Sequence, residues 1–407
     1  MTKYSKVPFS EIATLIRGVS YDKKVASVLA KDGYIPVLRA NNIQKSLVLA
    51  DLVYVPSDLV KEEQMIRKGD IVLAMSSGSK DLVGKSAQAN NDINAAFGTF
   101  CGLIRAKDNI DSKFLGLYFQ TQEYRNFVSY QSQGVNICNL KKKDIESLQI
   151  PLPPLPTQSA IVSRIETLFA ELDKATEHLR TAQQQLKTYR QAVLNHWLNN
   201  EDGKWEMVPI KEIISVISNG STPKADKMFS KGEIQFLKVY NLNFDGSINL
   251  SKEPVFIERD THETLLKRSQ TKQGDVLINI VGPPLGKVSI IPEGEKEYNI
   301  NQAIVMFRPN EFVTSKFLAY YLMSPQIIEW LTSTSKATAG QYNVKVSTCR
   351  EIMFPKVSIQ EQQRIVKEIE SRLSQATASE TYIEYAVQQA EALRQSILKK
   401  AFEGELV

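Results

Sequence analysis

The sequence predicts a mixed α/β protein with an internal repeat, in which two globular parts alternate with two long helices that pair as a coiled coil. Three observations predict this fold class. Two segments recur at a constant separation along the chain. Each recurring segment begins a stretch of apolar residues at the alternating three- and four-residue spacing of a heptad. Between these stretches lie short β-rich runs, separated by loops rich in Gly, Asn, Ser and Lys.

The repeat is clearest in the helical segments. "TQSAIVSRIETLF" (157–169) corresponds to "EQQRIVKEIESRL" (361–373), and "YRQAVL" (189–194) corresponds to "LRQSIL" (393–398), both at a separation of 204 positions. Looser matches pair "KGDIVLAM" with "QGDVLINI" and "SKFLGLYF" with "SKFLAYYL". The chain therefore contains two copies of one unit of about two hundred residues.

A long helix is expected in each copy. The apolar residues of the first helix alternate in steps of four and three, which indicates a left-handed coiled coil with a period of about 3.5 residues. From Thr157 to Leu198 this helix would be about 63 Å long, at about 1.5 Å per residue. The predicted seam comprises Ile161, Ile165, Leu168, Leu172, Leu179, Leu186 and Val193 in the first helix, and Ile365, Ile369, Ile383, Leu393 and Ile397 in the second.

These patterns divide the chain into four segments. The globular parts are expected at 1–153 and 203–356, and the helices at 154–202 and 357–407. Because the two heptad helices belong to one chain, we expect them to pack together and to hold two copies of one globular part at a fixed separation.

The composition indicates the class of protein to which the chain belongs. With 407 residues, 43% hydrophobic and 23% charged, the chain has the composition of a soluble globular protein. Its polar start predicts no signal peptide, and no apolar run is long enough to span a membrane. The three Cys form no metal or redox spacing, which favours the reducing cytoplasm. A net charge of +5 is compatible with a nucleic-acid partner.

The segment Gly84-Lys85-Ser86 invites comparison with a phosphate-binding P-loop. That motif needs four residues between its two glycines, whereas five residues separate Gly78 from Gly84. The second copy has Gly286-Lys287-Val288, without the hydroxyl that would hold magnesium. Both copies keep a Gly-Lys turn between two strands. The pattern therefore favours a turn that offers a cation, with a nucleotide-dependent enzyme as the weaker alternative.

Three motifs resemble one known family. Two variable globular segments, each followed by a segment such as "IPLPPLPTQSAIVSRIETLF" or "FPKVSIQEQQRIVKEIESRL", and the terminal "LRQSILKKAFEGELV" resemble the specificity subunits of Type I restriction–modification systems. The resemblance covers the whole chain. It departs from the pattern in the second proline segment, where Val357, Ser358 and Gln360 replace prolines. The entry to the second helix is therefore expected to differ in shape from the entry to the first.

The resemblance implies a fold and a function. Each globular part would be a target recognition domain for one half of a split sequence in double-stranded DNA, and the two helices would pack antiparallel and fix the gap between the halves. The helices would also dock methyltransferase subunits, two of them, and restriction subunits would join later. S-adenosylmethionine would bind to the methyltransferase partner. The subunit itself would need no cofactor or metal and would perform no chemistry.

Loops at corresponding positions of the two copies supply the candidate DNA-binding residues. Arg or Lys suits guanine, Asn or Gln suits adenine, and Lys or Ser in loops suits phosphates. The first set is Arg39, Asn41 and Asn42 with Lys238, Tyr240 and Asn241; the second is Ser77, Lys80 and Lys85 with Lys287; the third is Gln133 and Asn136 with Gln341 and Asn343.

The residues give no sign of catalysis. No Gly-x-Gly occurs, which argues against a Rossmann-type loop for a methyl donor. The only Pro-Pro segment that resembles an amino-methyltransferase motif is Gly282-Pro283-Pro284-Leu285, which lacks the required flanking residues. The three His are scattered along the chain. Besides the enzyme, a coiled-coil scaffold that joins proteins without DNA specificity stays open as an alternative, although the repeated loop sets argue against it.

Overall fold

The computed structural model describes residues 3–78, 82–131, 138–294, 296–338 and 341–407. It divides the chain into two units. The first comprises Met1–Leu179 with Glu384–Val407, and the second comprises Arg180–Ile383. Each unit therefore contains one globular part and a portion of both long helices.

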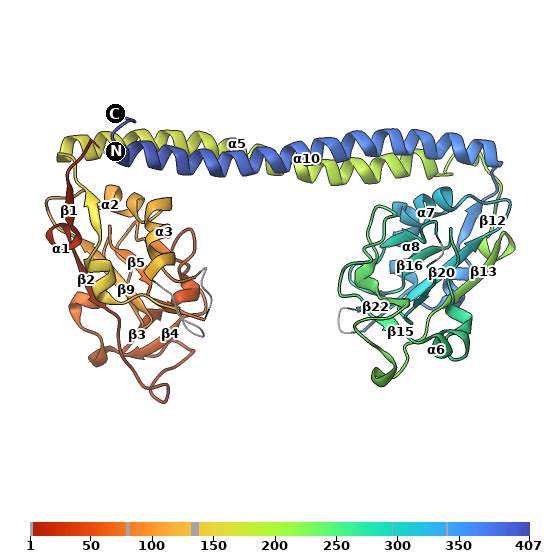
Figure 1. Ribbon diagram of the computed structural model, residues 1–407, viewed down its shortest axis with the longest axis horizontal. Coiled ribbons are helices and arrows are strands. Elements are labelled where there is room, and N and C mark those ends of the chain that lie inside the picture. The colour runs from red at the N-terminus through yellow and green to blue at the C-terminus, as the bar shows by residue number, and fades with distance from the viewer. Residues whose placement is uncertain (1–2, 79–81, 132–137, 295, 339–340) are drawn as a thin grey trace. The chain divides into compact units, whose positions relative to one another are not determined.

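The long helices have the lengths that the heptads predict. Helix α5 spans Leu155–Leu198 and helix α10 spans Ile359–Glu403, so that both lie inside the segments expected to be helical. In the first unit the beginning of α5 packs beside the end of α10, and in the second unit the end of α5 packs beside the beginning of α10. The pairing is therefore antiparallel in each unit (Figure 1).

Two small sheets form the centre of the first globular part. A four-stranded antiparallel sheet has the order β2-β9-β5-β7, and a three-stranded sheet has the order β4-β3-β8 with β3 and β8 parallel. Shorter pairs join β1 to β11 and β6 to β10. The strands are β1 (Lys6–Pro8), β2 (Ala13–Arg17), β3 (Tyr34–Leu38), β4 (Val53–Pro56), β5 (Ile71–Ala74), β6 (Ser76–Ser77), β7 (Ser86–Gln88), β8 (Ala96–Phe97), β9 (Cys101–Ala106), β10 (Cys138–Asn139) and β11 (Gln149–Pro151). The α-helices are α1 (Phe9–Ile12), α2 (Ser112–Tyr118), α3 (Gln122–Gln131) and α4 (Lys142–Glu146).

The second globular part repeats this topology. Its four-stranded sheet has the order β13-β20-β16-β18, and its three-stranded sheet has the order β15-β14-β19, again with one parallel pair. The strands are β12 (Met207–Pro209), β13 (Ile214–Asn219), β14 (Ile234–Leu237), β15 (Phe256–Ile257), β16 (Val276–Asn279), β17 (Val281–Gly282), β18 (Val288–Ile290), β19 (Tyr298–Ile300), β20 (Ile304–Pro309), β21 (Lys336–Thr338), β22 (Gln341–Asn343) and β23 (Met353–Pro355). The α-helices are α6 (Arg259–Glu263), α7 (Ser315–Met323), α8 (Pro325–Thr334) and α9 (Val346–Arg350). The repeat read from the sequence thus extends to strand order.

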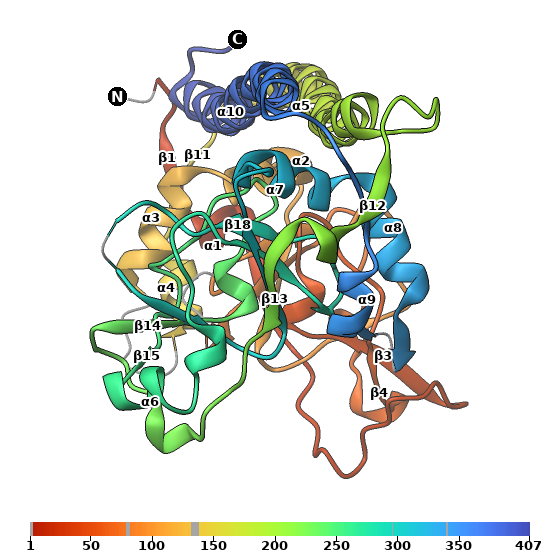
Figure 2. The same cartoon turned by 90° about the vertical axis from the view of Figure 1, so that its right-hand side faces the viewer.

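Each globular part shares its main core with the long helices. In the first unit Phe402 of α10 packs on α2, with its ring centroid 4.8 Å from that of Phe114 and 5.5 Å from that of Tyr118. In the second unit Leu198 of α5 joins the core that contains Phe317 of α7. Figure 2 shows α7 beneath the long helices, with β14 and β15 at the end of the domain away from them.

A glutamine at the start of each long helix ties that helix to its globular part. The Gln158 side chain is fully buried; it accepts a hydrogen bond from the Asp111 N–H at 2.7 Å and donates one to the Pro153 carbonyl at 2.8 Å. Gln362 does the same in the second copy, accepting from Thr314 N–H at 2.8 Å and donating to Val357 at 2.9 Å. Asp111 and Thr314 also cap α2 and α7. The contact is preserved although the second proline segment is degenerate.

A buried ion pair stabilises the four-stranded sheet of each unit. Arg105 binds both oxygens of Asp70 at 2.9 and 2.6 Å, and Arg308 binds those of Asp275 at 2.8 and 2.7 Å. Both carboxylates also accept the backbone N–H of the residue three positions earlier, in the turn that contains the Gly-Asp pair. These are the aspartates of the repeated "KGD" and "QGD" segments, so the repeat preserves a network whose buried polar groups are satisfied.

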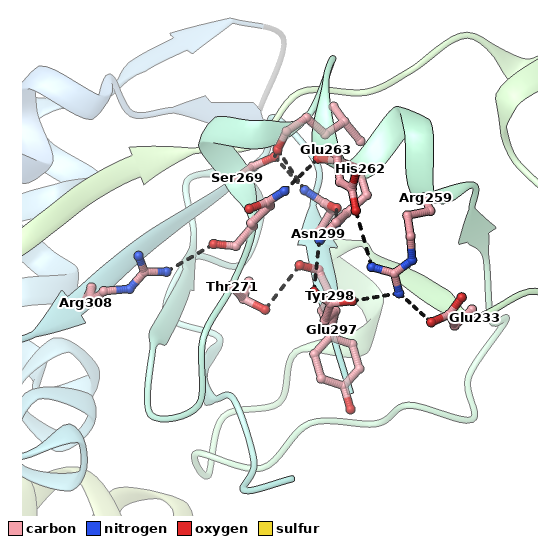
Figure 3. Close-up of polar contacts among 12 residues, drawn as sticks. Glu233, Arg259, His262, Glu263, Ser269, Thr271, Glu297, Tyr298, Asn299 and Arg308 are labelled. Atoms are coloured by element: carbon pink, nitrogen blue, oxygen red, sulfur yellow. Dashed lines mark hydrogen bonds and ion pairs between the residues drawn. The ribbon is translucent and has the colours of Figure 1, made fainter. Parts of the chain in front are cut away.

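The interiors of the two three-stranded sheets differ. The first sheet is packed with aliphatic side chains, among them Val37 and Ala96. In the second, buried Asn299 contacts His262 and donates to the Leu266 carbonyl at 2.9 Å (Figure 3). One of the three scattered histidines is thus part of the domain's structure. The same topology accommodates two different interiors because the buried amide and imidazole satisfy each other.

The structure corrects one predicted seam residue. Leu393 is 50% exposed, and its neighbour Arg394 is turned towards α5 instead. The Arg394 guanidinium lies 4.1 Å from the centre of the Phe169 ring and forms an ion pair with Asp173. The corresponding Arg190 bonds to Glu380 at 3.0 Å. A long arginine stem buries apolar surface while its charged end finds a partner, so the seam includes charged positions that counting apolar residues overlooks.

The other seam residues differ in how far their side chains are buried. The residues at the ends of the long helices are buried, and those further along are half-buried. The buried set is Ile161, Ile165, Val193, Ile365, Ile369 and Ile397, and the half-buried set is Leu168, Leu172, Leu179, Leu186 and Ile383. The helix ends therefore contribute most to the cores of the two units.

We predict that Asp275→Ala lowers the free energy of unfolding of the second unit by about 3 kcal/mol, because the half-buried Arg308 guanidinium loses its carboxylate partner. All three Trp lie in Arg180–Ile383, so tryptophan fluorescence during urea denaturation reports on this unit. Glu351→Ala, which breaks the exposed pair with Lys211, is the matched control and should cost less than about 1 kcal/mol. Equal losses for the two variants would contradict a structural role for the buried pair.

Candidate nucleic-acid interface

The first candidate loop is organised by an asparagine in each copy. A single 3-10 turn, η1 (Ala40–Asn42) or η6 (Val239–Asn241), follows β3 or β14. Asn42 is buried; its side-chain oxygen accepts the Arg39 N–H at 2.8 Å, and its amide donates to the carbonyls of Val48 and Ala50 at 2.9 and 2.7 Å. The side chain therefore closes the loop that follows.

The second copy repeats this arrangement. The oxygen of Asn241 accepts the Lys238 N–H at 2.9 Å, and its amide donates to the carbonyls of Asn249 and Lys252, both at 2.9 Å. The structure thus corrects the prediction that Asn42 and Asn241 read bases. Both side chains are buried and hold a loop, and their donors and acceptor are already used.

The remaining residues of this set lie at the surface. Arg39 and Asn41 are exposed, and the Arg39 guanidinium donates to the Asp51 carbonyl at 2.7 Å. In the second copy the Lys238 ammonium lies 5.9 Å from the centre of the Tyr240 ring. Burial, and then Glu253, raise the pKa of Tyr240, so its hydroxyl stays protonated and donates to the Glu253 carbonyl at 3.0 Å.

The Gly-Lys turns of the second set lead into strands. Gly84 and Gly286 have φ of 74° and 94°, and a Cβ would come within 2.7 Å of Val128 or 2.8 Å of Ile328. Glycine is required at both positions for backbone conformation and for space. Each turn is followed by β7 or β18, whereas a P-loop must open a helix. The geometry therefore does not fit a nucleotide site.

The lysines of these turns have different surroundings. Lys85 is exposed. Lys287 is half-buried; its ammonium donates to the Val239 carbonyl at 3.4 Å and lies 5.8 Å from the centre of the Phe244 ring. In the second unit the turn thus contacts the loop after η6, and the first and second candidate sets lie side by side.

The third set joins the same surface in the second unit. Strand β22, which contains Gln341 and Asn343, pairs with β17 directly before the Gly-Lys turn, with Asn343 opposite Val281. Asn343 is exposed. The three sequence-derived sets of the second unit are therefore brought together by β17, β22 and the contact of Lys287 with η6.

In the first unit, only part of the corresponding surface lies within the described residues. Ser77, half-buried on β6, pairs with Cys138 of β10, as β17 pairs with β22 in the other copy. The predicted Lys80, Gln133 and Asn136 lie outside the described residues. Strand β10 begins just after the segment that holds the last two, so the order of the elements is the same in both units.

The tips of the loops that Asn42 and Asn241 hold were not among the residues predicted from the sequence. Lys45 and Phe244 are exposed at these tips. The signal was available: within the aligned segments "LRANNIQK" and "LKVYNLNF", the asparagine recurs while the residue three positions later changes from Lys to Phe. Only the structure shows that the recurring residue faces inward.

The described residues include neither a cluster of metal ligands nor a membrane-spanning helix. In this part of the chain, no three or more His, Cys, Asp or Glu side chains are placed so that they could hold a metal ion. Nor does any helix there combine the length and apolar character needed to cross a membrane.

Comparisons with known proteins agree with one another. A family model described as the Type I restriction modification DNA specificity domain matches residues 1–181 and 202–388. The EcoKI specificity subunit of Escherichia coli strain K12 is 32% identical, over 98% of this chain and 88% of that protein. The StySPI specificity subunit of Salmonella potsdam is 31% identical, over 99% of this chain and 89% of that protein.

Solved structures share the fold. A chain from a type I R-M system, solved to explain its assembly and conformational transition, has a TM-score of 0.73 at 18% identity, with 99% of this chain and 98% of that chain covered. The HsdS subunit from Thermoanaerobacter tengcongensis has a TM-score of 0.54 at 19% identity, with coverages of 99% and 97%.

We predict that Asn241→Ala lowers the unfolding free energy of the second unit by about 1–3 kcal/mol, because one N–H and two carbonyls lose their partner. The isosteric Asn241→Asp, which cannot donate, should also be destabilising. Tyr240→Phe, which removes only the single hydrogen bond from the neighbouring hydroxyl to the Glu253 carbonyl, is the control and should cost less. The check is urea denaturation followed by tryptophan fluorescence; an Asn241→Ala variant as stable as Tyr240→Phe would show that the loop does not depend on this side chain.

Proposed function

Since the chain belongs to the family of Type I restriction–modification specificity subunits, we propose that it reads a split DNA sequence, one half with each unit. The observation that carries this proposal is the duplication of the candidate surface. The asparagine-held loop and the Gly-Lys turn occur once in each unit, on the same sheet topology. Two copies of one reading surface in one chain suit a target with two separate halves.

The residues of each surface divide into two roles. The lysines of the Gly-Lys turns, Lys85 and Lys287, suit phosphate contacts, which position the protein on DNA without reading sequence. Exposed side chains with several donors or acceptors, such as Arg39 and Asn343, suit base edges in the major groove. We assign Asn42 and Asn241 to neither role, because they support the loops from within.

The long helices carry the assembly role in this proposal. They hold the reading surfaces at a set separation and dock the methyltransferase subunits, two of them, with restriction subunits added to the complex. Because each unit contains portions of both long helices, each unit could offer a similar docking surface, which suits two copies of one partner.

We assign the chemistry to the partners. S-adenosylmethionine would bind to the methyltransferase subunit, and this chain would need no cofactor. Burial raises the pKa of the Cys101 and Cys349 thiols to about 12, so both stay protonated at neutral pH and are poor nucleophiles. His262 is engaged within the core. A scaffold without DNA specificity is the second candidate; the duplicated loops favour the DNA reader.

We predict that Lys85→Ala combined with Lys287→Ala weakens DNA binding equally on specific and random sequences. If each lysine neutralises one phosphate, the slope of log affinity against log salt should become smaller by about two. Fluorescence anisotropy over a salt series, with the chain in its methyltransferase complex, measures this slope. Lys142→Ala with Lys211→Ala removes the same charge from other surfaces and should leave the slope nearly unchanged. A double variant with the original slope would remove the Gly-Lys turns from the DNA-binding surface.

We predict that exchanging residues 1–153 for those of a related subunit changes one half of the methylated sequence only. The exchange leaves Gln158, which holds the globular part to α5, in the recipient. Genome-wide mapping of methylated adenines in the complex gives the result, with the original chain as the control. Simultaneous change of both halves would show that the units do not read independently. A complex of the original chain that methylates without any split motif would contradict the proposed function itself.

A further inference from the structure

We propose that the tip residue of the asparagine-held loop, Lys45 in the first unit and Phe244 in the second, determines base preference in each half-site. Phe244 would contact the C5-methyl group of a thymine, and Lys45 would donate to the acceptors of a guanine. The inference rests on the proposed function and adds the residue and the kind of base to it.

The two tips share one anchor but differ in length, because the closing bridge encloses three residues in the first copy and five in the second. In both copies the asparagine amide holds the far side of the loop, and a one-residue antiparallel bridge closes it, Ile43 with Leu47 and Leu242 with Ile248. Lys45 and Phe244 project from the resulting turn. A tip of this kind presents its side chain with little freedom in the backbone, which suits selective contacts.

The second tip is also tied to the strand that follows the Gly-Lys turn. The Val288 N–H donates to the Asn243 carbonyl at 2.9 Å, and the Ile290 N–H donates to the Gly246 carbonyl at 2.9 Å. Phe244 is thus held beside the turn that offers Lys287. A phosphate bound to that ammonium would place the groove of the duplex within reach of the tip.

Phe244 has the character of a contact residue. Its side chain is 55% exposed, and the Lys287 ammonium lies 5.8 Å from the centre of its ring. The ring lines a cavity with Leu285 and Tyr320, and more than half of its surface remains available for a further contact. DNA offers a partner for both groups, because a thymine methyl is apolar and the backbone next to it is anionic.

The difference between the copies favours DNA over a protein partner. The anchoring asparagine repeats, yet the tip changes from a cation to an aromatic ring. A subunit that docks on both units in the same way would favour the same residue in both. A split target with two different halves favours tips that share an anchor and differ in residue and in loop length.

The test uses the full chain in complex with its methyltransferase subunits, on DNA targets randomised at every position of one half-site. We expect Phe244→Ala to lower the preference for thymine at one position by about tenfold, which corresponds to one base contact. Phe244→Lys should shift the preference there towards guanine. Lys45→Ala should lower a guanine preference in the other half by a similar factor.

Phe312→Ala is the matched control, because Phe312 is likewise exposed (63%) in the same unit and the variant keeps the backbone carbonyl that accepts a hydrogen bond from Gln362 of α10. Its base preferences should equal those of the original chain. An intact split motif with the same preferences in Phe244→Ala and Phe244→Lys would overturn this inference alone. Loss of the methyltransferase subunit from Phe244→Ala, seen by size-exclusion chromatography, would overturn it in favour of a protein contact. Absence of a split motif with the original chain would overturn the proposed function as well.

Discussion

The junction between each globular part and its long helix depends on one buried glutamine. Gln158 joins the proline segment, the cap of α2 and the first turn of α5 through a single amide, and Gln362 does so in the second unit. A buried side-chain amide costs free energy unless its oxygen and nitrogen are hydrogen-bonded. Here the oxygen accepts a hydrogen bond and the nitrogen donates one. The direction in which each domain leaves its helix is therefore set by hydrogen bonds, while the surrounding apolar core supplies most of the stability.

The two copies conserve what supports the fold and vary what faces solvent. The repeated contacts are buried or anchored to the backbone: the glutamine, the Asp–Arg pair and the asparagine that holds the loop. Replacing one partner of such a contact leaves an unsatisfied group. The exposed residues between them carry no such penalty, so Lys45 and Phe244 can differ without disturbing the domain.

The contact between the long helices also includes ion pairs. Arg190 and Arg394 occupy the same position of the repeat, and each forms an ion pair with the opposite helix of its own unit. Such pairs contribute little net stability, but they disfavour other alignments, since a shift would leave a half-buried charge without a partner. A fixed register is what the proposed spacing role of the long helices requires.

The sequence by itself determined the repeat, the two long helices and their pairing, because heptad spacing and recurring motifs are local or periodic properties that survive in the primary structure. It also determined that the Gly-Lys segments form turns. It placed the loops, yet it could not tell which of their residues face inward. Asn41 and Asn42 are adjacent and chemically identical, and only the tertiary structure decided that Asn42 closes the loop while Asn41 is exposed. The same applies to Leu393 and Arg394. The rotation of a helix about its axis depends on the side chains of the helix that it packs against. The apolar pattern alone therefore placed Leu393 in the seam, whereas Arg394 is the residue that contacts α5.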